Sequence, residues 1–169
     1  MPEYIEKIRV TVRVSRPGEP AVEGAVSLAT VSEFHSGPET LLELLNAPLR
    51  VIPFERQADH AMLLLNRHDL QWVMASPQVR EELIRPQTFS FTREERVCVR
   101  MQGGAEMEGV LQMELPERLN RASDYLNGLE DFFPLSTQKG IFLIHKHHVR
   151  ETRLFDSSPL PVPDGAANS

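Results

Sequence analysis

The chain has 169 residues, a net charge of −6 and one cysteine, Cys98. An acidic chain without a basic block is poorly suited to bind phosphate backbones. One cysteine permits no internal disulfide, which favours a reducing compartment. The N-terminus lacks the basic start and apolar run of a signal peptide, and no apolar stretch approaches the ~20 residues of a membrane helix. We therefore expect a cytoplasmic protein that does not enter membranes.

The most informative pattern is an internal repeat. Blocks of the second half match blocks of the first in the same order, from residues 9–14 with 96–101 to residues 62–70 with 141–149. The spacing between matching residues changes only between blocks, as different loop lengths in duplicated units would produce. We predict a tandem duplication of one β-β-α-β-β unit of about 75 residues.

Each unit is expected to open with a hairpin. Valines alternate with polar residues in 10–14, which is typical of a strand with one buried face. A second strand follows, and Gly24 in its middle indicates a bulge or a close backbone approach. The second copy repeats this pattern in residues 97–115, with Gly103 and Gly104 in the turn.

A short helix is expected after the hairpin. Ser36 and Glu39 have the spacing of a capping box, and leucines follow at helical spacing in residues 41–45. In the second copy an apolar stripe runs from Leu119 to Leu126, and Asn127 with Gly128 marks a helix end. Two further strands complete each unit, over residues 50–55 and 61–74, and over 131–137 and 140–153.

The expected organisation is a first repeat (1–75), a connector of one or two helical turns (76–88), a second repeat (89–154) and a disordered Pro-rich tail (155–169). A β-rich unit of this size has a marginal core by itself. We therefore predict an α+β, mainly β fold, in which the repeats pack with pseudo-two-fold symmetry as a sandwich of two sheets or as two fused small barrels.

Histidines provide the sharpest candidate site. On a strand, His145 and His147 would point to the same side and could share a metal ion. A zinc site needs a third and usually a fourth ligand, which His35, His60 or His68 would have to supply. The alternative is a solvated strand end. No catalytic residue and no cofactor is predicted, because no nucleophile, base and orienting group occur together.

The second copy resembles a bacterial domain family of unknown function. The resemblance covers residues 95–153 and rests on Glu108-Gly109, the Arg-Ala-Ser-Asp-Tyr-Leu-Asn run at 121–127, Phe-Phe-Pro-Leu at 132–135 and the Lys146–His148 strand end. This resemblance implies no activity. The opening hairpin is similar to Sm-like or SH3-like small barrels, but the residues with which such proteins hold RNA bases are missing.

Three hypotheses follow for the function. The leading one is a non-catalytic protein-interaction or scaffold protein of the bacterial cytoplasm, which binds a protein partner or itself through open strand edges. The second is a nucleic-acid binder with a small-barrel fold, by analogy of fold alone. The third is a metal- or small-ligand-binding protein that uses His145 and His147.

Overall fold

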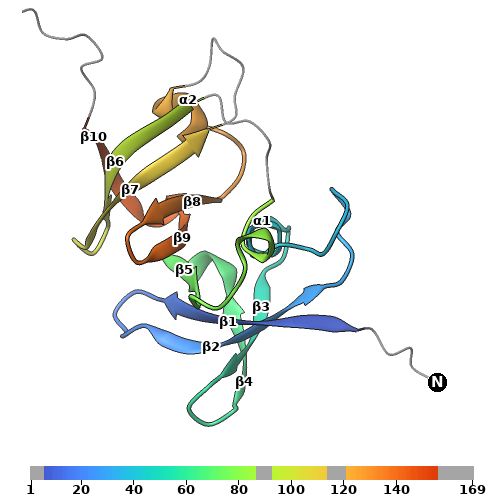
Figure 1. The fold of residues 1–169 in the computed structure, drawn as a ribbon. Helices are drawn as coiled ribbons and strands as arrows, with labels where there is room; N and C mark the ends of the chain where they lie inside the picture. The colour runs from blue at the N-terminus through green and yellow to red at the C-terminus, as the bar shows by residue number, and fades with distance from the viewer. Residues whose placement is uncertain (1–5, 87–92, 114–120, 156–169) are drawn as a thin grey trace, which may run out of the picture.

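The computed structural model describes residues 6–86, 93–113 and 121–155, and these residues are mainly β (Figure 1). The strands of residues 7–75 form one lobe and those of residues 93–154 form a second. The strands are β1 (Lys7–Ser15), β2 (Val22–Ala29), β3 (Val51–Arg56), β4 (Met62–Asn66), β5 (Trp72–Ala75), β6 (Arg93–Met101), β7 (Glu106–Met113), β8 (Phe132–Thr137), β9 (Gly140–His145) and β10 (Val149–Leu154).

All these strands belong to one antiparallel sheet, in the order β10-β6-β7-β8-β9-β5-β1-β2-β3-β4. Within each half the order is fifth, first, second, third and fourth strand. The halves are joined where β5 pairs with β9, with Val73 opposite Leu143. The alternative of a sandwich built from two separate sheets is therefore wrong, because the lobes share an edge-to-edge ladder.

The predicted strands over residues 61–74 and 140–153 are each interrupted. Short 3-10 helices occupy Arg67–Asp69 and Lys146–His148, so each half has five strands instead of four. The cause is a side-chain cap at the same place in both halves. The Asn66 Oδ1 accepts a hydrogen bond from the His68 N–H at 2.9 Å, and the His145 Nδ1 accepts one from the His147 N–H at 3.0 Å. Such local bonds compete with the strand ladder.

Two short helices lie outside the sheet, α1 (Leu41–Asn46) and α2 (Ala122–Leu126). The capping box of α1 is formed by Thr40 and Glu43, not by Ser36 and Glu39 as predicted. Glu39 instead accepts a hydrogen bond from the Ala29 N–H at 2.9 Å, which ties the helix start to the end of β2. Within the described residues, no helix is long and apolar enough to span a membrane.

The connector and tail are covered only in part. A 3-10 helix, Glu81–Leu83, provides the expected helical turn of the connector. The structure describes the predicted tail only at residue 155, and the start of the second helical stripe, Leu119, lies outside the described residues.

Two apolar clusters fill the lobes, and one of them draws on both halves. The second cluster contains Val99 and other residues of β6 to β9. The first consists mainly of residues 10–84, but it also includes Phe132 and Leu143 from the second half, which are 1% and 0% exposed. The first lobe therefore depends on the second for part of its core.

Close backbone packing explains the mid-strand glycines, as predicted for Gly24. A Cβ on Gly109 would lie 2.5 Å from the Ser136 O and 2.7 Å from the Leu135 Cγ. A Cβ on Gly24 would overlap the Glu55 O and the Phe54 ring in the same way. Both glycines allow the second strand to cross closely over the third.

Replacing Gly109 with alanine should lower the free energy of unfolding by about 1–3 kcal/mol, because the added methyl group must displace backbone and core atoms. Urea denaturation monitored by circular dichroism would measure the loss. The Gly103→Ala variant is the control, since a Cβ there meets no atom within 4 Å. Equal stabilities of the two variants would contradict the packing role of Gly109.

Candidate functional site

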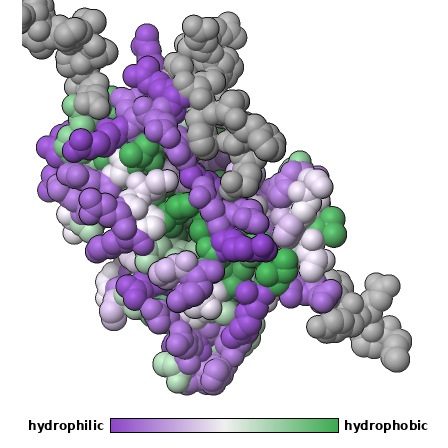
Figure 2. All heavy atoms as spheres, in the orientation of Figure 1, coloured by the Kyte–Doolittle hydropathy of each residue, from purple (hydrophilic) through white to green (hydrophobic). Residues whose placement is uncertain are grey.

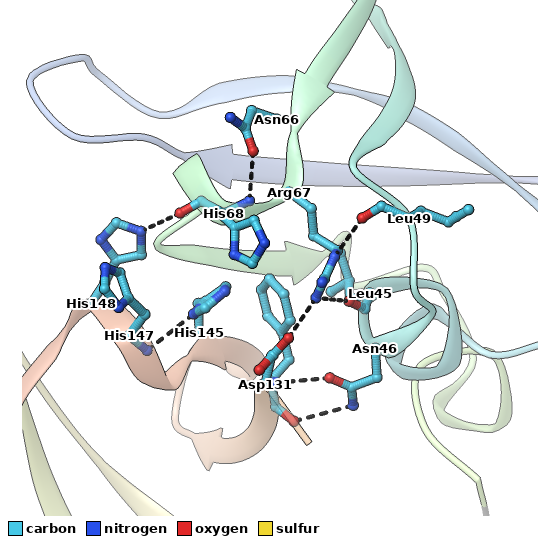
Figure 3. Close-up of polar contacts among 11 residues, drawn as sticks. Leu45, Asn46, Leu49, Asn66, Arg67, His68, Asp131, His145, His147 and His148 are labelled. Carbon is cyan, nitrogen blue, oxygen red and sulfur yellow. Dashed lines mark hydrogen bonds and ion pairs between the residues drawn. The ribbon is translucent and has the colours of Figure 1, made fainter. Parts of the chain in front are cut away.

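The candidate site lies at the junction of the two halves and is centred on Arg67 (Figure 3). Its side chain is buried, and its Nε donates to the Leu49 O at 2.8 Å. Its Nη1 donates to the Leu45 O at 3.2 Å and to the Asp131 Oδ2 at 2.8 Å. The guanidinium lowers the pKa of Asp131 below its ordinary value. One cation thus holds the end of α1 in the first half and the start of β8 in the second.

A second polar contact at the junction comes from the last residue of α1. The Asn46 Oδ1 accepts a hydrogen bond from the Phe132 N–H at 2.8 Å, and its Nδ2 donates to the Phe132 O at 3.3 Å. The amide therefore satisfies both backbone groups of a residue whose side chain is buried in the first core. Backbone bonding and apolar burial at Phe132 reinforce each other.

Four histidines gather beside this ion pair (Figure 3). The ring of His145 is buried, and its centroid lies 5.8 Å from His68, 6.0 Å from His147 and 5.5 Å from His148. The His148 Nε2 lies 2.7 Å from the His68 O, so this nitrogen carries a proton and donates across the junction. The imidazoles thus come from both halves of the chain.

Burial decides the charge state of His145. Desolvation lowers the pKa of His145 to about 4, and nearby Asp131 opposes this shift only in part. The ring is neutral at neutral pH, with Nδ1 accepting from the His147 N–H and the proton on Nε2. Within the described residues this Nε2 is buried and has no hydrogen-bond partner.

The predicted arrangement of the metal candidates is wrong. His145 and His147 do not share one strand face, because His147 lies in the 3-10 helix. The other proposed ligands His35 and His60 contact Glu43 and Glu55 at 2.8 and 2.9 Å, away from the cluster. Among the described residues, no three His, Cys, Asp or Glu side chains are grouped to hold a metal ion.

A groove also runs between the lobes. Its volume is about 760 Å³, and Leu42, Phe132, Phe133 and Pro134 contribute to its apolar lining. Figure 2 shows apolar surface in the middle of this face, where the lobes meet. Lys146 lies at the groove, and burial lowers the pKa of its ammonium group. The groove combines an apolar lining with a partly desolvated cation.

The sequence interpretation missed an exposed apolar face on the last strands of the first lobe. Met62 and Leu64 of β4 are 65% and 68% exposed, and Val51 of β3 is 42% exposed. β4 ends the sheet, so within the described residues no strand pairs with its outer edge. The available signal was the repeat, which aligns Met62 and Leu64 with apolar residues of β9.

Comparison with protein-family models, curated proteins and solved structures yields no match for this chain. The resemblance to a bacterial repeat family and to small barrels is therefore carried by sequence motifs alone.

We expect stability to fall by about 3 kcal/mol as the pH drops from 6.5 to 4, because His145 titrates at 6.5 when unfolded and at about 4 when folded. In this window the unfolded chain binds more protons than the folded one, so acid favours unfolding. Chemical denaturation across this pH range would measure the slope.

The His145→Asn variant tests the origin of that slope. Asparagine is the residue that caps the equivalent 3-10 helix, at Asn66, and it does not titrate in this range. The variant should keep the cap and show a flatter stability profile, whatever its stability at pH 8. An unchanged slope would assign the acid sensitivity to other groups.

Proposed function

We propose that this chain is a non-catalytic protein-interaction or scaffold protein, built by tandem duplication of one β-rich unit. The duplication is supported by matching features of the two halves. The strand order is the same in both, and the 3-10 helix after the fourth strand is capped at the same position. The two caps are made by different side chains, Asn66 and His145, so their shared position does not depend on one residue type.

The strand registers support the same correspondence. Pro53 lies opposite Leu64 in the first half, and Pro134 lies opposite Leu143 in the second. The glycine in the second strand approaches the carbonyl of the third strand in both halves. On this register Val51, Met62 and Leu64 occupy the positions of Phe132, Ile141 and Leu143.

The observation that carries the proposal is that these corresponding positions are buried or partly buried in the second half and exposed in the first. Phe132 and Leu143 are buried against the first lobe, and Ile141 packs against the same core. Met62, Leu64 and Val51 have the same place in the unit but remain exposed. The unit thus has a docking face that is used inside the chain by one half and is free in the other.

The physical properties of this face favour protein binding. Burying apolar surface contributes roughly 25 cal/mol per Å², so large exposed aliphatic side chains next to each other favour association. Among the described residues, no strand pairs with the outer edge of β4, so its backbone groups can pair with an extended segment as a further strand. A partner strand could therefore form backbone hydrogen bonds and apolar contacts with the same part of β4.

We expect a photo-reactive amino acid at position 64 to crosslink to protein in living cells, because this side chain lies on the proposed docking face. The control position is 151 on β10, which is also exposed but lies at the opposite end of the sheet. Crosslinked products would be detected on denaturing gels and identified by mass spectrometry. Equal or absent crosslinking at both positions would contradict a docking role for this face.

A further inference from the structure

We propose that the partner of the β4 edge is β4 of a second copy of this chain, paired antiparallel about Leu64 in a two-fold dimer. This inference rests on the proposed function, since it names the occupant of the same docking face.

The register shows which backbone groups are free. The Arg56 N–H donates to the Ala61 O, and the Arg67 N–H donates to the Arg50 O, both at 2.9 Å. The odd-numbered residues of β4 therefore form the hydrogen-bonded pairs with β3. Pro53, which has no N–H, lies opposite Leu64. In antiparallel pairing the intervening residues direct both backbone groups to the other edge. The free edge is therefore formed by Met62, Leu64 and Asn66.

These residues are compatible with their own copies. Pairing centred on Leu64 places it opposite Leu64 of the second copy, and Met62 opposite Asn66. No charged residue occurs between Met62 and Asn66, so the pairing brings no like charges together. The exposed side chains of Leu64 from both copies would then lie side by side, with Pro53 of each copy as the next neighbour.

The other end of the sheet is different. The terminal strand β10 contains three exposed charged residues, Arg150, Glu151 and Arg153. Charges along a terminal strand oppose pairing with other chains. The β4 edge lacks this protection, so the two ends of the sheet are not equally suited to association.

A head-to-tail assembly would reproduce the internal junction, with β10 in the role of β5. Glu151 and Arg153 would then replace Trp72 and Met74, although the ring of Trp72 packs on Phe142 at 4.9 Å between centroids. The mismatch is greater at the ion pair. Lys146 and Arg50 correspond to Arg67 and Asp131, so two cations would meet where the internal junction has a salt bridge. The two-fold arrangement avoids both conflicts.

The size of the contact sets its strength. A five-residue strand and its neighbouring side chains cover less than the roughly 800 Å² per partner of a standard interface. We therefore expect a dissociation constant on the order of micromolar, and a dimer that forms as concentration rises.

Sedimentation velocity of the purified full chain over a concentration series tests this. The wild type should shift from monomer to dimer, and Leu64→Lys should weaken dimerisation at least tenfold, because two ammonium groups would meet at the two-fold axis. Leu64 is exposed, so the variant should melt like the wild type. Glu151→Lys is the matched control on β10 and should dimerise normally.

A cysteine experiment tests the register, in a Cys98→Ser background. Leu64→Cys should form a disulfide-linked dimer under mild oxidation, because the facing Cα atoms would lie ~5.5 Å apart, within disulfide range. Met62→Cys should not, because its own copy lies about four residues further along the strand. Equal linkage at both positions would overturn the register.

Two other outcomes overturn self-pairing. They are open-ended oligomers that Glu151→Lys dissolves, and a monomer at all concentrations. The proposed function is judged separately by the crosslinks at position 64 in cells. Crosslinks to a different protein from a chain that stays monomeric would refute the dimer and retain the docking face.

Discussion

The pairing of β5 with β9 converts two small lobes into one sheet, and most other features of the molecule follow from it. Val73 and Leu143 meet there, and Leu143 with Phe132 enters the core of the first lobe. The Arg67–Asp131 ion pair and the amide of Asn46 fix the same boundary from its polar side. A β-rich unit of about 75 residues buries little surface alone, so the junction supplies what each lobe lacks.

The sequence was a good guide wherever one residue pattern determines one local structure. The alternating valines of 10–14 indicated a strand with one buried face, and Gly24 indicated close backbone packing. The breaks after β4 and β9 could not be predicted in this way, because they depend on a capping bond from a single side chain within an apolar run. The start of α1 was misplaced for a similar reason. The Glu39 carboxylate accepts a hydrogen bond from the backbone of β2, and the capping box is formed by Thr40 and Glu43 instead.

The candidate site was predictable in part. The histidine run at 145–148 correctly indicated the segment of the candidate site. Its contact with His68 of the first half could not be predicted, because no local spacing in the sequence indicates it. The exposed face of β3 and β4 carries ordinary core-like residues, so its sequence looks like that of any buried strand. Only the strand order reveals that β4 is a terminal strand while its counterpart β9 is internal. The two halves share one strand order but cap the 3-10 helix with different side chains, a neutral amide at Asn66 and a titratable imidazole at His145.

The contribution of Phe132 and Leu143 to the first core also has a consequence for synthesis on the ribosome. Residues 7–86 emerge first, and they contain most of that core but not its last two side chains. The N-terminal lobe therefore stays incomplete until translation has passed position 143. During that interval the surface that will receive Phe132 and Leu143 is open to solvent, so the nascent chain has the greatest need for protection by chaperones before its second half appears.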